Sequence, residues 1–391
     1  MFTVKRDDVL VRPFVLALIL GIAAALPTAV RGGAIVDGVE ISLVTCAPHE
    51  EIYSLYGHTA IRYRDADRGV DLVFNYGVFR PESPGFVWRF AMGKTDYELG
   101  VAPTKAFLKY YEQWGSEVTE QVLRLTGAEK ERITRALRVN CLPENRVYRY
   151  NVFFDNCATR PRDIIVGNLT GTVAYLPRTG YAPTFREMLR ECTARHPWAT
   201  FGNDMLLGLR ADMSTTQREQ QFLPGNLRYD FDRAVVTRQG VSEPLVCERR
   251  ELVAPGVQAV EGGFPLSPLS CSLLLLALSL AVFAWEQRRK SLALWFDIAL
   301  MALTGAAGCL LTLMLFSEHP ATSSNLQVLL LNPLPLFFIW PVAHGRKTRF
   351  FTAWALLILL FLAGGFWQSY AEGMYVVALC LLLRAARHLK Q

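Results

Sequence analysis

The sequence predicts an α+β domain that is followed by a helical transmembrane bundle. Residues from about 32 to 263 mix apolar, charged and turn-forming residues, whereas the chain from about 264 onward consists mainly of long apolar runs. Short segments of period-two alternation and longer helical segments both occur in the first part. A soluble part of roughly 230 residues is long enough to bury one hydrophobic core.

The elements of the α+β part can be placed along the chain. Alternating apolar residues predict strands at 39–45, 56–64 and 70–76, with a turn before the third. Aromatic residues predict a helix around 107–114, and a further helix is expected at about 129–139. The segment NVFFDNCATRPRDIIV at 151–166 predicts a turn that opens another helix, because Pro161 is tolerated in a first turn.

The N-terminus and the apolar runs predict the membrane topology. Basic residues precede an apolar run at 13–30, which is the arrangement of a secretory signal peptide or an uncleaved signal anchor over residues 1–31. The α+β domain would then occupy 32–263, and a five-helix transmembrane domain would occupy 264–391. The five expected spans are 266–285, 292–316, 326–343, 350–367 and 374–383.

The loops between these spans predict their orientation. Basic residues lie between spans one and two, between spans three and four, and after span five, whereas 317–325 and 368–373 contain no Lys or Arg. The positive-inside rule therefore places the α+β domain outside the cytoplasm. In a Gram-negative cell this predicts a multi-pass inner-membrane protein whose α+β domain faces the periplasm. The net charge of +6 comes largely from these loops, so no nucleic-acid partner is expected.

Four polar residues lie in or near the expected spans. Asp297 is close to the basic edge of its span, so its carboxylate is expected to reach toward the cytoplasmic interface. His319, Asn325 and Asn332 would lie on the extracytoplasmic side, facing the α+β domain, where His319 and Asn332 could contribute to a lipid pocket.

The eight cysteines give no support for a metal site. No C-x-x-C motif occurs, so neither a metal nor another cofactor is predicted. In an exported domain, four cysteines could form two disulfides and leave one free thiol. The four are Cys46, Cys141, Cys192 and Cys247, in a pairing that the sequence does not define.

Cys157 and His58 form the candidate catalytic pair. Cys157 lies at the expected start of a helix, where aligned backbone dipoles lower a thiol pKa. His58 lies in an expected strand after Gly57, whereas the domain's other histidines, His49 and His196, lie in loops. A structural cysteine or half of a disulfide, together with an ordinary strand histidine, is the alternative interpretation of the same pattern.

The motifs around this pair resemble a known family. YGHTAIR, then FNYG, then VFFDNCATR follow the order of the circularly permuted branch of the NlpC/P60 (papain-like) superfamily, in which the histidine precedes the cysteine. The chain more closely resembles the Bacteroides-type lipoprotein N-acyltransferases (Lnb). Further matching segments are TFR at 184–186, GLRAD at 208–212, FLP at 222–224, EHP at 318–320 and NPL at 332–334.

The resemblance implies a fold and a set of site residues. The fold would be a permuted papain-like domain, with Cys157 as nucleophile and His58 as base. Asn75, on the strand after His58, would orient the imidazole, with Asp71 as the alternative and Tyr76 a possible hydrogen-bonding partner at the site. Four residues are assigned to substrate binding: Arg160 and Arg162, for a phosphate headgroup, together with Tyr76 and Asn156. The alternative for the two arginines is a solvated helix face or a salt bridge to Asp163.

The implied reaction is acyl transfer between two lipidic substrates. An acyl chain would move from a phospholipid to Cys157 as a thioester, and then to the N-terminal amine of a diacylated lipoprotein. A cysteine peptidase or amidase that acts on peptidoglycan is the alternative, but it does not need a multi-span membrane region. A non-catalytic envelope scaffold is the third interpretation, and the intact GH and DNC motifs argue against it.

Overall fold

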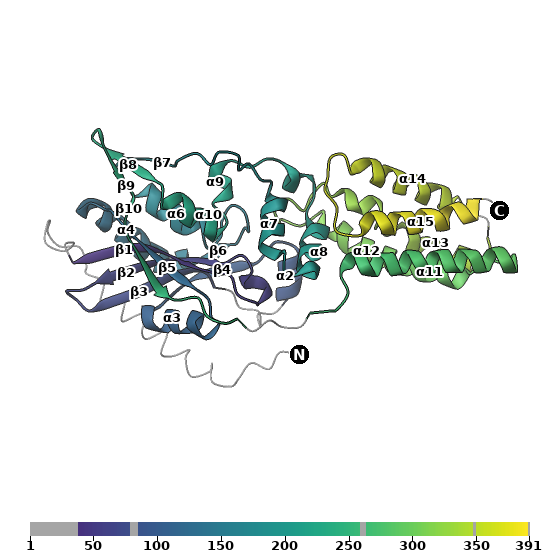
Figure 1. Ribbon diagram of the computed structural model, residues 1–391, viewed down its shortest axis with the longest axis horizontal. Helices are drawn as coiled ribbons and strands as arrows, with labels where there is room; N and C mark the ends of the chain where they lie inside the picture. The colour runs from purple at the N-terminus through teal and green to yellow at the C-terminus, as the bar shows by residue number, and fades with distance from the viewer. Residues whose placement is uncertain (1–37, 79–84, 259–262, 347–348, 390–391) are drawn as a thin grey trace.

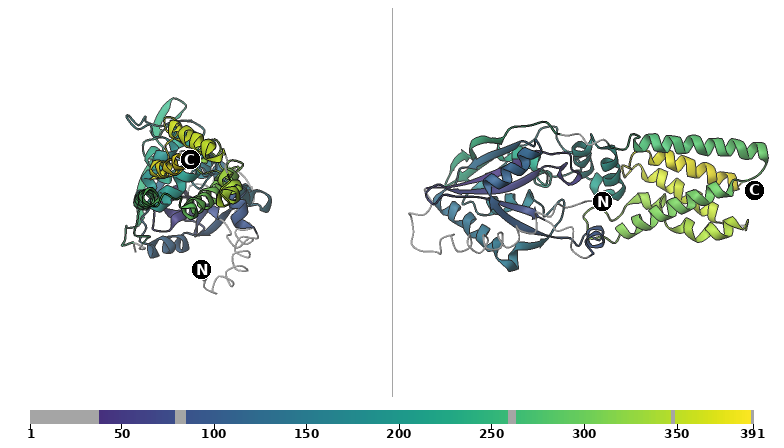
Figure 2. Two further views of the ribbon diagram at one scale, coloured as in Figure 1. Left: turned by 90° about the vertical axis from the view of Figure 1, so that its right-hand side faces the viewer. Right: turned by 90° about the horizontal axis from the view of Figure 1, so that it is seen from below.

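A computed structural model describes residues 38–78, 85–258, 263–346 and 349–389. A β-sheet domain occupies one end of an elongated molecule and a helical bundle occupies the other (Figures 1 and 2). Helices α7 (Phe185–Thr193) and α8 (Pro197–Leu206) lie between the two ends. The expected signal segment at 1–31 lies outside the described residues. The expected α+β class and the C-terminal helical region are both confirmed.

Within the described residues, the main sheet has seven strands in the order β10-β5-β1-β2-β3-β4-β6, and every pairing is antiparallel. Its strands are β1 (Val39–Cys46), β2 (His58–Asp65), β3 (Val70–Val78), β4 (Asp96–Pro103), β5 (Val118–Leu123), β6 (Val147–Arg149) and β10 (Val246–Val253). A smaller sheet is formed by β7 (Thr172–Ala174), β8 (Val235–Arg238) and β9 (Val241–Pro244). The three strands that the sequence predicts are thus the central ones.

Helices cover both faces of the main sheet. The remaining helices of this domain are η2 (Ile52–Ser54), α2 (Phe86–Ala91), α3 (Thr104–Gln113), α4 (Gly127–Cys141), α5 (Pro143–Arg146), α6 (Thr159–Gly167), η3 (Leu209–Asp212), α9 (Gln217–Gln220) and α10 (Pro224–Phe231). Alternate strand residues such as Leu43 pack with α4, α6 and α10, while Val44 and its neighbours pack against α3 on the opposite face. This alternation is the period of two that the strand pattern predicts.

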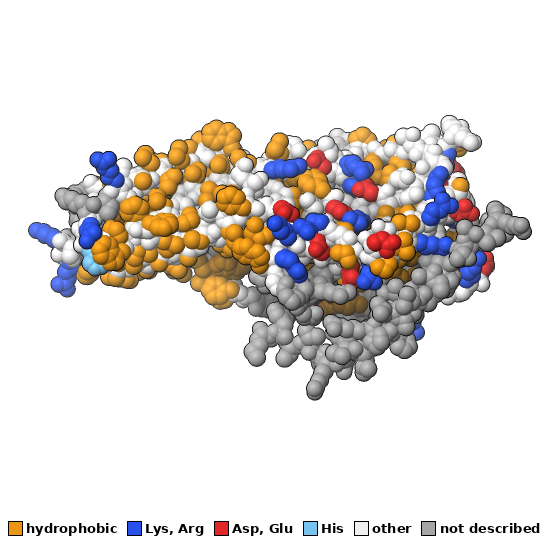
Figure 3. All heavy atoms as spheres, turned by 180° about the vertical axis from the view of Figure 1, so that it is seen from behind, with side chains coloured by type: hydrophobic (Ala, Val, Ile, Leu, Met, Phe, Trp, Pro, Cys, Tyr) orange, Lys and Arg blue, Asp and Glu red, His pale blue; other side chains and the backbone are white. Residues whose placement is uncertain are grey.

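The C-terminal region is a bundle of α11 (Pro268–Arg289), α12 (Leu294–Met314), η4 (Leu326–Leu329), α13 (Leu334–Ala343), α14 (Phe350–Gly364) and α15 (Met374–Leu389). In the described residues, three segments are long and apolar enough to cross a membrane: Pro268–Arg289, Leu294–Met314 and Leu326–Ala343. Phe350–Gly364 is a shorter apolar helix. Hydrophobic side chains cover the visible face of the bundle, and Lys and Arg gather at its far end (Figure 3).

The third expected span is not one continuous helix. The chain turns between η4 and α13, where Asn332 Oδ1 accepts a hydrogen bond from the backbone N–H of Leu334 at the start of α13. The following Pro333 has no N–H to continue an earlier helix. Gly308 of α12 lies against this turn, since a methyl group at Gly308 would come within 2.2 Å of the Asn332 backbone.

Asp297 does not reach toward the membrane interface, contrary to the sequence prediction. It is 1% exposed, and its carboxylate pairs with the guanidinium of Arg384 at 2.7 Å and with His388 at 2.8 Å. Arg384 is fully buried and also pairs with Glu286 at 2.6 Å. The carboxylate remains inside the bundle because buried charges need partners of opposite sign.

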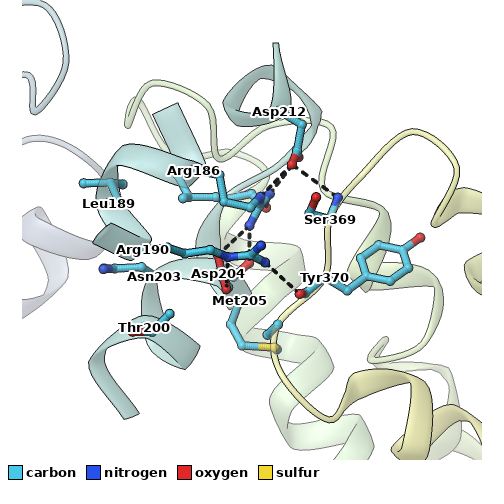
Figure 4. Close-up of polar contacts among 12 residues, drawn as sticks. Arg186, Leu189, Arg190, Thr200, Asn203, Asp204, Met205, Asp212, Ser369 and Tyr370 are labelled. Carbon is cyan, nitrogen blue, oxygen red and sulfur yellow. Dashed lines mark hydrogen bonds and ion pairs between the residues drawn. The ribbon is translucent and has the colours of Figure 1, made fainter. Parts of the chain in front are cut away.

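A buried polar network joins the sheet domain to the bundle (Figure 4). Arg186 of α7 is 1% exposed and binds the carboxylates of Asp204 and Asp212. Asp212 accepts a hydrogen bond from the backbone N–H of Ser369, and Arg190 donates one to the carbonyl oxygen of Tyr370. The two segments that meet here come from α7–η3 and from the loop between α14 and α15.

The loop before η4 completes this junction. Asn325 Nδ2 donates to the carbonyl oxygen of Met205, and Gln327 Nε2 donates to that of Asp204. The expectation that Asn325 faces the α+β domain is therefore confirmed. His319 is also at this end of the bundle, because its backbone lies against Gly93 of the sheet domain, while Asn332 lies within the bundle.

All eight cysteines are free thiols in the structure. The two disulfides that the sequence allows are therefore absent. Cys46 is buried in the sheet, Cys141 ends α4, Cys192 lies near the end of α7, and Cys247 is exposed on β10.

Candidate active site

His58, Asn75 and Cys157 come together at one end of the central strands. His58 begins β2, and Asn75 lies near the end of the neighbouring strand β3. The Nε2 atom of His58 lies 2.6 Å from Asn75 Oδ1. Because this contact occupies Nε2, the imidazole presents Nδ1 as its other nitrogen. The alternative residue Asp71 does not reach His58, since Arg62 and Thr104 bind its carboxylate.

Gly77 of β3 lies beside both the histidine and the cysteine. Its φ of +100° is a conformation that L residues other than glycine rarely adopt. A methyl group on Gly77 would lie 3.5 Å from Cys157 Cβ and 4.0 Å from His58 Cε1. The ladder between β3 and β4 is irregular between Asn75 and Val78, so the strand bends where it passes the cysteine.

Asn156 forms the turn that carries Cys157. Its Oδ1 accepts hydrogen bonds from the backbone N–H groups of Ala158 and Thr159, and its Nδ2 donates to the carbonyl oxygens of Val152 and Phe222. These bonds satisfy backbone donors at the start of α6, as a capping residue does. All of this side chain's bonds are used to hold the turn, so it positions Cys157 rather than facing a substrate.

The two arginines assigned to a headgroup are engaged within the protein. Arg160 makes a bidentate ion pair with Asp155, at 2.5 and 2.8 Å, and its guanidinium lies 3.5 Å from the centroid of the Tyr148 ring. Arg162 is buried and pairs with Asp163, which is the alternative that the sequence allowed. Both guanidinium groups are therefore bound to carboxylates that lie just before α6 or within it.

Tyr76 points into the core instead of the site. It is 1% exposed, and its ring packs edge-on against Tyr148. Among the tyrosines close enough to Cys157 for a charge on its sulfur to influence them are Tyr97, Tyr148 and Tyr150. Burial first, and then the Cys157 charge, raise the pKa values of Tyr97, Tyr148 and Tyr150. This aromatic environment has no distinctive sequence spacing.

Burial decides the protonation of the pair. It lowers the pKa of His58 to about 4, although the hydrogen bond with Asn75 acts in the opposite direction. It raises the pKa of Cys157 to about 11, although the backbone N–H groups of Thr59 and of Cys157 itself stabilise the thiolate. Cys157 lies just before α6, as the sequence predicts. Desolvation nevertheless raises its pKa more than the helix dipole lowers it, so the resting pair is a neutral thiol and a neutral imidazole.

The pH dependence of alkylation follows from these pKa values. Between pH 7 and pH 10, the rate of Cys157 modification by iodoacetamide should rise about tenfold per pH unit, because only the thiolate reacts. A preformed thiolate–imidazolium pair would instead give a pH-independent rate over this range. Quantifying the Cys157 peptide by mass spectrometry, with Cys157→Ser as the blank, distinguishes the two.

Replacing Gly77 by alanine should lower the rate of the reaction that Cys157 carries out about 10–100-fold. The change strains a backbone with a positive φ that borders both His58 and Cys157, and small displacements at such a position are costly. Gly69→Ala is the matched control, since Gly69 also has a positive φ of +65° but a methyl group there meets no atom within 4 Å. Equal losses in both variants would contradict a role for Gly77 in the site.

No arrangement for a metal occurs in the part of the chain that the structure describes, because no three His, Cys, Asp or Glu side chains come together. The fold and the site together define a class of membrane protein. In this class an α+β domain, joined to a helical bundle, brings together the thiol of a cysteine, the imidazole of a histidine and the amide of an asparagine.

Comparison with known families identifies the particular family. Residues 29–189 match the Lnb N-terminal periplasmic domain, and residues 259–391 match the Lnb transmembrane domain. No curated protein and no solved structure gave a significant match. The two domain matches cover about three quarters of the chain, which belongs to the Lnb family. It is therefore a membrane protein of the lipoprotein N-acyltransferase type with a periplasmic domain.

Proposed function

We propose that this chain moves a fatty acyl chain from a phospholipid to Cys157 as a thioester, and from there to the N-terminal amine of a diacylated lipoprotein. The observation that carries the proposal is the contact of His58 with Asn75 at 2.6 Å, on a strand whose Gly77 borders both His58 and Cys157. A circularly permuted papain-like domain at 32–263, held at the inner membrane by five spans, is the proposed framework.

The first half of the reaction is attack on an ester. His58 Nδ1 takes the proton from the Cys157 thiol as the sulfur attacks the ester carbonyl carbon, because the two groups are neutral at rest. The ester C–O bond then breaks, and His58 returns the proton to the oxygen of the departing lysophospholipid. Backbone N–H groups beside Cys157 stabilise the oxyanion, and one such donor is commonly worth about 3–4 kcal/mol.

The second half regenerates the thiol. The neutral amine of the lipoprotein attacks the thioester carbonyl carbon while His58 accepts its proton. The new C–N bond forms, the C–S bond breaks, and the proton returns to the sulfur. Asn75 keeps the imidazole oriented through both halves, which is the positioning role that an amide partner supplies to a thiol–imidazole pair.

Attachment to the membrane suits this chemistry. Both substrates carry acyl chains, and extracting such chains from a bilayer costs about 0.8 kcal/mol per CH₂. A catalytic domain fixed to the bundle by the Arg186 network reaches lipids without extracting them completely.

The test is acyl transfer in a defined system. The full chain is reconstituted in vesicles with an alkyne-tagged phospholipid and a diacylated lipopeptide, and the product is analysed by mass spectrometry. We expect an amide-linked third acyl chain on the lipopeptide and release of lysophospholipid. Release of stem-peptide fragments from peptidoglycan, without lipid transfer, would overturn the proposal in favour of the peptidase or amidase.

A further inference from the structure

A cavity of about 440 Å³ lies outside the group formed by His58, Asn75 and Cys157. Three segments line it: the loop after β1, the connection between α7 and α8, and the segment that leads toward α11. Its lining consists of Pro48, His49, Glu50, Leu55, Cys192, Arg195, His196, Gly256 and Gln258. We name this feature the loop cavity.

Two buried polar groups of the loop cavity lack hydrogen-bond partners. His49 is 3% exposed and stacks on Trp114, with 4.8 Å between ring centroids, yet its Nδ1 makes no hydrogen bond with any described residue. Glu50 Oε2 is likewise buried without a hydrogen bond in the described structure, and it lies 3.6 Å from His196 Nε2. Buried polar atoms are rarely left in this state, so a bound molecule with polar groups fits here.

The loop cavity presents both signs of charge. The Arg195 guanidinium is exposed, and it makes no ion pair with the described part of the chain. The Glu50 carboxylate supplies the opposite charge, and two imidazoles supply further donors or acceptors. A guanidinium is well suited to bind a phosphate, and a carboxylate is well suited to bind an ammonium group. A zwitterion that carries both groups matches the lining better than a simple anion does.

The position of the loop cavity suits a membrane lipid. The α8 helix that follows His196 packs against the membrane helices α11 and α12. Trp198 on α8 donates a hydrogen bond to the carbonyl oxygen of Leu266, two residues before α11 begins. On the other side, the cavity loop follows Cys46, which pairs directly with His58 across β1 and β2. The cavity thus lies between the membrane helices and the end of the sheet that carries the base.

We propose that the loop cavity binds the phosphoethanolamine headgroup of the acyl-donor phospholipid, with its phosphate against Arg195 and His196 and its ammonium group against Glu50. This inference rests on the proposed function and names the donor's headgroup class. It also moves headgroup recognition away from Arg160 and Arg162, whose guanidinium groups are bound to Asp155 and Asp163.

The test uses headgroup probes without acyl chains. Binding of glycerophosphoethanolamine, glycerophosphoglycerol and inorganic phosphate is measured by calorimetry on the full-length Cys157→Ser protein, in which no thioester can form. We expect glycerophosphoethanolamine to bind about tenfold more tightly than the other two probes. Arg195→Ala should weaken its binding about tenfold, and Glu50→Gln should abolish the preference for the ethanolamine group.

Matched controls come from α4, where Arg135 and Glu131 are exposed and make no hydrogen bond or ion pair with the described part of the chain. Arg135→Ala and Glu131→Gln should leave binding unchanged. Equal binding of all three probes, binding that is insensitive to both cavity variants, or the absence of binding would each overturn the inference. A protein that binds the headgroup with these sensitivities but forms no thioester as wild type would contradict the proposed function and leave the cavity assignment standing.

Discussion

His58→Ala should lower the rate of thioester formation at neutral pH by about 10²–10⁴-fold, which is the usual contribution of a general base. The effect is expected to be large because burial raises the pKa of the Cys157 thiol to about 11, so hardly any thiolate exists without a base. Single-turnover labelling with a tagged phospholipid measures the rate. In the His58→Ala variant the rate of thioester formation should rise again at alkaline pH, because hydroxide then removes the thiol proton in place of the imidazole.

Asn75 and Asp71 provide the matched comparison for this prediction. Asn75→Ala should lower the rate because it removes the hydrogen bond to His58, whereas Asp71→Asn alters a pair with Arg62 away from the imidazole. The acid limb of the wild-type rate profile should lie near pH 4, since burial lowers the pKa of His58 to about that value. A larger loss in Asp71→Asn than in Asn75→Ala would contradict the assignment.

Arg186→Met should lower the free energy of unfolding of the sheet domain by about 3–5 kcal/mol. Removing one partner from a buried ion network leaves the other charges without compensation. Here the carboxylates of Asp204 and Asp212 would both lose the guanidinium that joins them (Figure 4). Thermal unfolding of the purified full-length protein, followed by intrinsic fluorescence, measures the change.

Arg190→Met is the control for this experiment. Arg190 pairs with the same Asp204, but its side chain is 37% exposed, so water can replace much of the lost interaction. We expect a loss of about 1 kcal/mol or less. If the two variants unfold at the same temperature, the buried network does not stabilise the junction as described.

The sequence was sufficient to predict the elements that have strong local signals. Strand alternation predicted the central strands, and the turn at Asn156 was predicted because capping and turn residues act over a few positions. The expected span at 326–343 matches an apolar segment of the structure, but hydropathy does not register the turn at Asn332 and Pro333 that interrupts it. The free thiols could not be predicted either, because a cysteine count does not say which cysteines the fold brings together.

Long-range effects explain what the sequence did not predict. The raised pKa of Cys157 depends on burial by segments that are distant in the chain. The contact of Asn75 with His58 also depends on strand register, and it was expected only through the family resemblance. Arg160 and Arg162 carry the charge that a headgroup needs, but their carboxylate partners are found only by folding the chain. The burial of Asp297 with Arg384 likewise joins residues 87 positions apart.

The acyl-thioester on Cys157 is the central claim, and one measurement tests it most directly. Full-length protein is incubated with an alkyne-tagged phospholipid, and the acyl label on the protein is measured before and after hydroxylamine treatment. We predict a hydroxylamine-sensitive label on the wild type and on Cys247→Ser, which removes an exposed thiol of β10, and none on Cys157→Ser. A label of undiminished intensity on Cys157→Ser, or none on folded wild-type protein supplied with lipid, would contradict the account.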